Sequence, residues 1–208
     1  MPKPPMGERV DGVRPWIQTH TDLAFDLDEP KPEQVNLWDI AWSLGHTCRY
    51  VGQCDQFWSV AEHSLLVADL VVAGGHPELE LQALLHDAEE AYTGDWSRPL
   101  KTLMYAMCPA LMVIPKLVKR AIAERFDVVL DPEHPAIKLA DDLALSTERK
   151  VLRGPAPRPW GKFPDPAPGV LVIPTLDPVF AAHQFYSRAR ELMTQDQLRW
   201  PRRRHAAQ

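Results

Sequence analysis

Residues 84–95 read LLHDAEEAYTGD, and the interpretation of the whole chain depends on this stretch. Its leucines continue an apolar run with helical spacing, and Gly94 ends that run. Ionisable side chains stand within it: His86, Asp87, Glu89 and Glu90. Burying an unpaired charge is costly, so a helix that faces a core needs partners for these groups. A metal ion would be such a partner, provided that further ligands come from elsewhere in the chain.

The composition is that of an ordinary soluble globular protein. The chain has 208 residues, of which 45% are hydrophobic and 25% are charged, and this length suffices for one domain with its own core. The formal net charge of −5 gives no positive footprint for a nucleic-acid backbone. We interpret the basic residues 199–208 as a solvated tail.

Cysteine usage and hydropathy favour the cytoplasm. The three cysteines are odd in number and form no CxxC pair, so we predict neither a disulfide framework nor a thiolate zinc site. The opening MPKPPMGERV has no apolar core of the kind that a secretory signal needs. The most apolar stretch, LLVADLVVA, is too short for a membrane span and contains Asp69. We therefore expect a cytoplasmic protein with no membrane or nucleic-acid partner.

Proline and capping residues mark the expected elements. Residues 16–27 are a candidate for a short extended pair. Ser59 and Glu62 form a capping box that opens a helix, Pro77 suits a helix start, and Asp177 can cap the last long helix. The predicted helices span residues 36–50, 60–74, 77–94, 114–126, 135–152 and 178–193.

The Pro-rich segment 153–177 cannot form regular structure, because proline lacks the amide donor and fixes φ. We predict it to be a loop on the surface. The chain as a whole, residues 1–208, is predicted to be one all-α domain, with its core in residues 16–152 and the helix 178–193.

Two more candidate ligands stand on other predicted helices. His63 lies in SVAEHSLL and Asp141 in IKLADDLAL, both in apolar surroundings. Glu90 lies four residues after His86, so the two project from neighbouring parts of one helix face. Two imidazoles and two carboxylates, with Asp87 included, form a mixed N/O set that suits Mn, Fe, Co, Ni or Zn. Each residue alone has a simpler explanation as a core or surface group, but their recurrence on separate helices favours a metal site.

In order along the chain, His63, the pair His86-Asp87 and Asp141 give the pattern H…HD…D. On these residues the chain resembles the HD-domain metal-dependent phosphohydrolases. It is most similar to the bacterial and phage branch that contains 5'-deoxynucleotidases and deoxynucleoside triphosphate hydrolases. The segments that carry this similarity are CRY before SVAEHS, LLHDAEEAYTGDWSRPLK and IKLADDLALSTER.

The resemblance implies a helical HD fold that holds a divalent cation on His63, His86, Asp87 and Asp141. It implies that Glu90 is the catalytic acidic residue, that Arg49 contacts phosphate and that Asp95 contacts the sugar. Chemistry supports these roles, since a guanidinium fits phosphate bidentately and a carboxylate beside a cation can orient water. Lys101 could add a second positive charge or could be a surface lysine. Glu62 is read as a helix cap, and Asp142 is left out.

The expected substrate is a deoxynucleotide, either a monophosphate or a triphosphate. An alarmone hydrolase of the same superfamily ranks lower, because its motif wants an acidic residue where Ala91 stands. A catalytically silent nucleotide-binding module has no need of the full ligand set with Glu90. Mg²⁺ is a candidate only as a second ion brought by the substrate, and a homo-oligomer is left open. Gly52-Gln53 departs from the Gly-His of many relatives.

Overall fold

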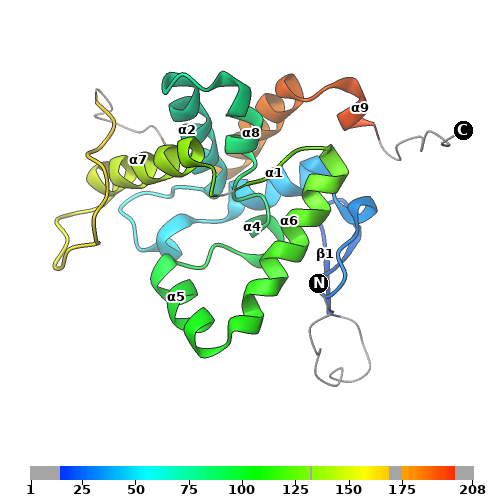
Figure 1. Cartoon of the computed structure of the whole chain (residues 1–208), viewed down its shortest axis with the longest axis horizontal. Helices are drawn as coiled ribbons and strands as arrows, with labels where there is room; N and C mark the ends of the chain where they lie inside the picture. The colour runs from blue at the N-terminus through cyan, green and yellow to red at the C-terminus, as the bar shows by residue number, and fades with distance from the viewer. Residues whose placement is uncertain (1–14, 132, 169–174, 200–208) are drawn as a thin grey trace, which may run out of the picture.

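The protein is all-α, as the computed structural model shows for residues 15–131, 133–168 and 175–199. A small antiparallel hairpin precedes the helices and pairs Ile17 with Phe25, which confirms the predicted extended pair. Its strands are β1 (Trp16–Gln18) and β2 (Ala24–Asp26). Figure 1 shows the helices that follow: α1 (Leu37–His46), α2 (Val60–Ala73), α3 (Glu80–Leu84), α4 (Glu90–Thr93), α5 (Arg98–Met107), α6 (Val113–Phe126), α7 (Pro135–Leu152), α8 (Pro178–Leu192) and α9 (Gln195–Leu198).

Local capping chemistry explains where the long helices begin. The Ser59 side chain accepts a hydrogen bond from the Glu62 amide, and the Glu62 carboxylate accepts one from the Ser59 amide, so the predicted capping box of α2 is confirmed. Asp177 caps α8 through the amides of Val179 and Phe180. The predictions for α2, α6, α7 and α8 hold to within a residue or two.

The helix predicted for residues 77–94 is wrong in its middle. A 3₁₀ turn (Pro77–Leu79) leads into α3, and the chain then leaves the α-helix over residues 85–89 before α4 begins. In this turn the amides of Ala88 and Glu90 donate to carbonyls three residues back, at 3.1 and 3.0 Å. Bonds of that span wind the backbone more tightly than an α-helix does. The tight turn carries His86 and Asp87.

The first helix is also shorter than residues 36–50. After His46 the chain forms an isolated β-bridge between Cys48 and Ser59, and the Arg49 amide donates to Trp58 O at 2.8 Å. A 3₁₀ turn (Arg49–Gly52) follows, in which Tyr50 has φ 59° and Val51 has φ 57°. The helices α5 and α9 were not predicted; α5 buries none of its side chains and forms a V with α6 (Figure 1).

The core gathers around α2, which packs against α1, α3, α7 and α8. The helices α1 and α8 approach closely at Gly45, where a Cβ atom would lie 2.6 Å from Pro178 O at the start of α8. Buried apolar side chains from the hairpin to α8 join in one cluster. The assignment of the whole chain to a single domain stays a prediction. A single domain requires one continuous core of this kind.

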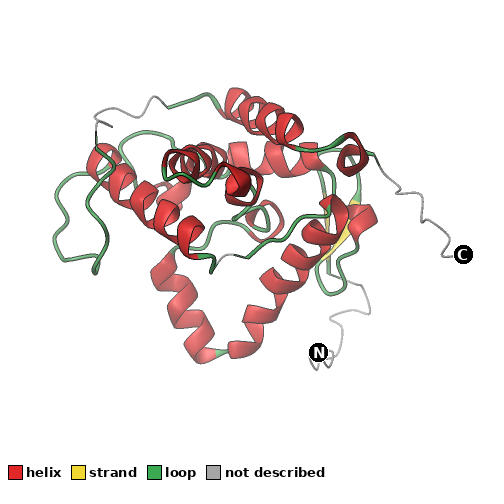
Figure 2. Cartoon of the chain, turned by 45° about the horizontal axis from the view of Figure 1, so that its top comes forward, coloured by secondary structure: helices red, strands yellow, loops and turns green. Residues whose placement is uncertain are grey.

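The Pro-rich segment has neither helix nor strand over residues 153–168, as predicted. Figure 2 shows it leaving the end of α7 as a long loop beside that helix. The Ala167 amide returns to α7 by donating to Thr147 Oγ1 at 2.9 Å. The rest of the predicted segment includes residues 169–174, which lie outside the described residues, and so does the basic tail beyond Arg199.

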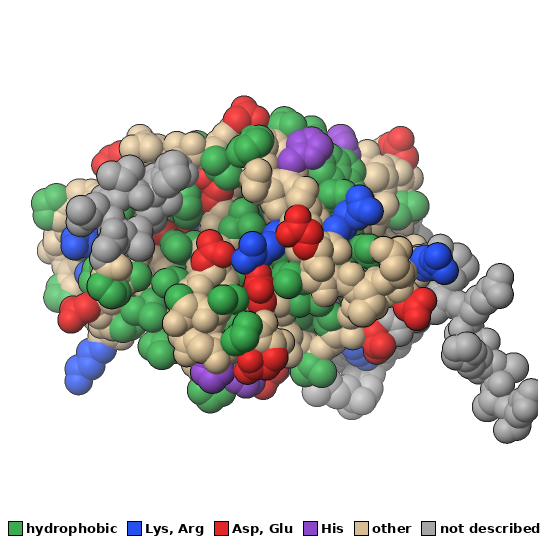
Figure 3. All heavy atoms as spheres, turned by 90° about the horizontal axis from the view of Figure 1, so that it is seen from above, with side chains coloured by type: hydrophobic (Ala, Val, Ile, Leu, Met, Phe, Trp, Pro, Cys, Tyr) green, Lys and Arg blue, Asp and Glu red, His purple; other side chains and the backbone are tan. Residues whose placement is uncertain are grey.

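No helix in the described part of the chain is long and apolar enough to cross a membrane. On the face drawn in Figure 3, acidic and basic side chains are interspersed among apolar ones. The described part of that face therefore offers no extended basic surface.

Candidate metal centre

Three separate segments bring the predicted ligands to one place. His63 comes from α2, His86 and Asp87 come from the tight turn, and Asp141 comes from α7. Ligand atoms of His63, His86 and Asp141 all lie within 4.8 Å of one another. Asp87 Oδ2 lies 3.1 Å from His86 Nε2 and 3.7 Å from His63 Nε2. The four residues thus face one point from different directions.

The two imidazoles have the tautomer that a metal site needs. His86 Nδ1 lies 2.7 Å from Ala83 O, and since a carbonyl only accepts, Nδ1 must carry the proton. His63 Nδ1 lies 2.6 Å from the carboxylate of Glu148 and is a donor in the same way. Both Nε2 atoms are buried without a hydrogen-bond partner among the described residues. In the neutral form, which metal binding requires, each ring directs its Nε2 lone pair into the cluster.

The spacing of the donor atoms fits an ion. His63 Nε2 lies 3.3 Å from Asp141 Oδ1, close to the 3.1 Å between His86 Nε2 and Asp87 Oδ2. Ligand atoms about 2.1 Å from a zinc-class ion are roughly 3.0–3.4 Å apart at octahedral to tetrahedral angles. Two nitrogens and two carboxylates make up the donor set of Mn, Fe, Co, Ni or Zn.

The electrostatics of the cluster favour a cation. Burial opposes the ionisation of Asp87, but His86, His63 and Arg49 outweigh it and hold its pKa well below the usual range. Burial also opposes the ionisation of Asp141, and its contact with His63 outweighs this and lowers the pKa. At His63, burial and Arg49 lower the pKa, whereas Glu148 and Asp141 raise it to about 9. Both carboxylates are therefore ionised at neutral pH.

A buried residue that sequence reasoning missed holds this arrangement together. Glu148 has no exposed surface and accepts from three groups: His63 Nδ1 at 2.6 Å, Tyr50 OH at 2.6 Å and Arg49 Nε at 3.2 Å. Arg49 and His63 hold its pKa below the usual range against the effect of burial. The signal was present in the sequence, because Glu148 follows Asp141 by seven residues and so lies on the same face of a helix.

Arg49 stands between Glu148 and the cluster. Its Nη1 atom lies 3.9 Å from Asp87 Oδ2, while its Nε atom is bound to Glu148. Burial lowers the pKa of Arg49, but Glu148, Tyr50 and the nearby aspartates outweigh it, so the guanidinium stays charged. A fixed cation here can meet a phosphoryl oxygen that also approaches the metal position.

Glu90 and Lys101 form a further ion pair near the cluster. Lys101 Nζ donates to Glu90 Oε1 at 2.6 Å, so Lys101 is partnered rather than a free surface lysine. Glu90 Oε2 is buried without a partner among the described residues. Burial and the neighbouring Asp87 raise the pKa of Glu90, and Lys101 offsets this only in part. A carboxyl group with a raised pKa is suited to proton transfer.

Asp142, which was not among the predicted ligands, is paired with two cations. Its Oδ1 atom pairs with Lys138 at 2.6 Å and with Arg98 at 3.5 Å. Arg98 also approaches Asp141 Oδ2 at 3.6 Å, and it is a second group that the sequence reasoning did not single out.

A cavity of about 840 Å³ opens over the cluster. Asp87 and Asp141 lie at one end, and Asp95 follows Gly94, whose φ of 78° turns the chain out of α4 toward this space. Ser97 rather than Asp95 occupies the N-cap of α5, so Asp95 is not that helix's cap. The predicted catalytic residue, Glu90, lines the cavity, and so do the predicted substrate-binding residues Arg49, Asp95 and Lys101.

Comparison with known proteins places the chain in a family. It is 34% identical over 137 residues to the uncharacterized protein YfdR of Escherichia coli K12. The aligned residues cover 66% of this chain and 72% of YfdR. It is 35% identical over 166 residues to the uncharacterized protein RCAP_rcc00048 of Rhodobacter capsulatus. Here the aligned residues cover 74% of this chain and 82% of that protein. No family model matches. This all-α protein, with two buried histidines beside the half-buried Asp141, belongs to the family of these two proteins.

Proposed function

We propose that the protein is an HD-type metal-dependent phosphohydrolase that acts on deoxynucleotides. One observation carries the proposal: two buried histidines, each fixed through Nδ1, direct free Nε2 atoms toward two carboxylates at the end of a cavity. The residues fit a divalent ion of the Mn, Fe, Co, Ni or Zn class. When bound, such an ion polarises a phosphoryl oxygen and lowers the pKa of water.

The chain's own residues supply the rest of the chemistry. Arg49 neutralises charge on the phosphoryl oxygens from the Glu148 side. Glu90 lines the cavity, and one of its carboxylate oxygens is held by Lys101 while the other has no partner among the described residues. This group can take a proton from water or give one to the leaving alkoxide. The attacking and leaving oxygens would thus meet Arg49 and Glu90 on two sides of one phosphorus atom.

Asp95 is the residue proposed to meet the sugar. It lines the cavity beside Arg49, Glu90 and Lys101, so its carboxylate can accept a hydrogen bond from a 3'-hydroxyl. A 2'-hydroxyl closed into this space without a partner would cost about 1–3 kcal/mol. We expect 2'-deoxynucleotides to be preferred, and Asp95→Ala to weaken the use of deoxy and ribo forms alike.

The competing functions give different outcomes in one experiment. Phosphate, pyrophosphate and triphosphate release is measured for dNMPs, dNTPs, the matching ribonucleotides and an alarmone. The protein is stripped of metal and reloaded with each of Mn²⁺, Co²⁺, Ni²⁺, Zn²⁺ and Fe²⁺. Metal-dependent release from deoxynucleotides, with ribonucleotides poorer, supports the proposal. Faster alarmone hydrolysis or binding without any release would overturn it in favour of the other two functions.

A further inference from the structure

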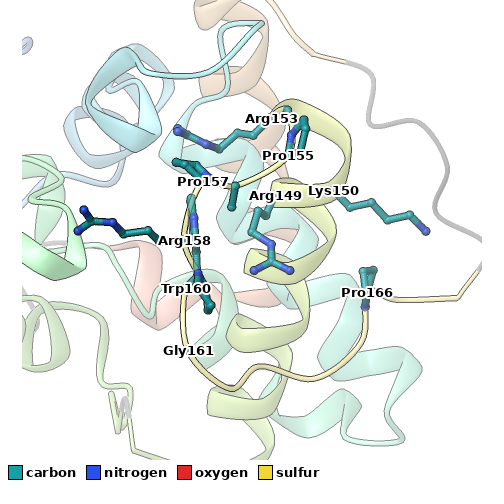
Figure 4. Close-up of a pocket in the computed structure, with 12 residues that line it drawn as sticks. Arg149, Lys150, Arg153, Pro155, Pro157, Arg158, Trp160, Gly161 and Pro166 are labelled. Carbon is teal, nitrogen blue, oxygen red and sulfur yellow. The ribbon is translucent and has the colours of Figure 1, made fainter.

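The Pro-rich loop separates two cavities. On one side it borders the 840 Å³ cavity over the metal cluster, and on the other a space of about 790 Å³ beside the end of α7. Figure 4 shows this second space between the loop and α7, with Arg149 on the helix and Trp160 on the loop. Trp160 lines both cavities, so its indole is a partition between them.

Side chains from three segments hold the indole in place. The guanidinium carbon of Arg149 lies 5.8 Å from the ring centroid of Trp160, and that of Arg153 lies 5.3 Å away. The Tyr50 ring lies 6.1 Å away at 57°. Arg153 is itself fixed, because it lies over Tyr50 and donates to Gln53 O. Trp160 is therefore attached to the turn that carries Arg49.

The two ends of the metal-side cavity differ in chemistry. At the cluster end the cations are matched by carboxylates: Arg49 with Glu148, Lys101 with Glu90 and Arg98 with Asp141. The loop side is formed by Pro157, Pro159 and Trp160, with Arg153 and Arg158 beside them. The ring centroid of Phe163 lies 5.4 Å from the guanidinium carbon of Arg98. Arg158 is exposed, and no carboxylate among the described residues lies within ion-pair distance of it. The loop side thus offers a flat aromatic group, with a guanidinium beside it that is unpaired among the described residues.

We infer that the loop wall around Trp160 is the nucleobase subsite of the cavity. This inference rests on the proposed function and extends it. With the phosphate at the metal cluster and the sugar near Asp95, the base extends to the loop and stacks on the Trp160 face on that side. Arg158 then offers donors to acceptor atoms on the base edge.

On the loop side Arg153 donates to Gln53 O, and the exposed Arg158 stands beside the aromatic wall. Aromatic faces stack on any base, at about 1–3 kcal/mol per base. That energy corresponds to about 5- to 150-fold in apparent affinity.

The test compares substrates with and without a base. KM is measured for dAMP, dGMP, dCMP and dTMP, and for 2-deoxyribose 5-phosphate, with Trp160→Ala, Trp160→Phe and Lys162→Ala. Lys162 is an exposed residue of the same loop that does not line the cavity. We expect Trp160→Ala to raise KM about 5- to 150-fold for the four nucleotides and to leave it unchanged for 2-deoxyribose 5-phosphate. Trp160→Phe should recover most of the loss, and Lys162→Ala should behave as wild type.

Direct binding separates failure of the subsite from failure of the proposed function. Calorimetric titration with the same five compounds needs no turnover. If nucleotides bind in a Trp160-dependent manner but none is hydrolysed, the inferred subsite is supported and the proposed function is wrong. If nucleotides are hydrolysed and Trp160→Ala affects base-containing and base-free compounds equally, the subsite is wrong and the loop acts only as a cover. If the protein neither binds nor hydrolyses these compounds or the matching dNTPs, both are wrong.

Discussion

The cavity over the metal cluster has two walls that differ in burial. The inner wall lies beside the cluster, and the loop wall is formed by the Pro-rich segment. Glu90, on the inner wall, is only 3% exposed, and His63 and Glu148 lie behind that wall with no exposed surface. Their charges are held by partners from other helices at 2.6 Å. On the loop wall, residues 154–159 are exposed and belong to no helix or strand. The difference is between a wall of buried, paired charges and a wall of exposed loop residues.

The inner wall is rigid because burial leaves its ions no alternative partners. A buried ion without its partner is far costlier than an exposed one, so each group stays where its partner stands. Preorganised groups of this kind stabilise a transition state without rearranging. The loop wall gains its order differently, because proline restricts the unfolded chain and so lowers the entropy cost of fixing a loop. Such a wall can vary in sequence without disturbing the metal cluster.

Removing a histidine of the metal cluster is expected to have the largest effect. His86→Ala removes one of the two free Nε2 atoms, so we expect metal content per chain and hydrolysis to fall to background. Elemental analysis of the purified variant measures the first, and circular dichroism checks that it is folded. His76→Ala is the matched control, because His76 is exposed and contacts Glu78. Full metal content in His86→Ala would remove the basis of the assigned cluster.

Changing Glu90 should separate chemistry from metal binding. Glu90→Gln keeps the shape of the side chain and loses the proton-transferring group, so we expect turnover to fall roughly 10²- to 10⁴-fold with metal retained. Glu89→Gln is the control, since Glu89 pairs with Lys119 at 3.1 Å and does not line the cavity. A Glu90→Gln variant with wild-type kcat would show that Glu90 has no part in proton transfer.

Glu148 should act as a positioning residue. Glu148→Gln weakens its hold on His63 and Arg49, and we expect metal affinity to fall about 10- to 100-fold. Glu148→Ala also leaves Arg49 buried without this partner, which should lower the free energy of unfolding by about 3–5 kcal/mol. Metal titration and urea denaturation measure the two effects separately. Lowered stability with unchanged metal affinity would make Glu148 a structural residue only.

The smallest effect is expected where the loop returns to α7. Thr147→Val leaves the Ala167 amide without its acceptor, at a cost of about 1–3 kcal/mol. Because the loss is local, we expect faster amide exchange at Ala167 and a higher KM, with little change in global stability. Thr147→Ser keeps the hydroxyl and should restore both. Unchanged exchange in the valine variant would show that the loop is held by other contacts.

The sequence alone determined the long helices and the candidate ligands. Capping boxes, N-caps and helical periodicity involve residues three or four apart, so Ser59 with Glu62 and the Asp177 cap could be identified without any knowledge of the fold. The order His63, His86-Asp87, Asp141 gave the ligand candidates, and the structure brings them to one place. The roles of Glu90, Arg49 and Asp95 stay predictions.

Only the tertiary structure decided how the site is held and enclosed. The tight turn at residues 85–89 replaces the helix that local periodicity predicted. Glu148 joins partners 85 and 99 residues away, and the proline segment became a cavity wall by folding back on α7 through Thr147. Such contacts depend on which helix faces meet in the core. Local propensity carries no information about which helix faces pack together. The free energy of that packing comes from burial and from pairing charges across the whole fold.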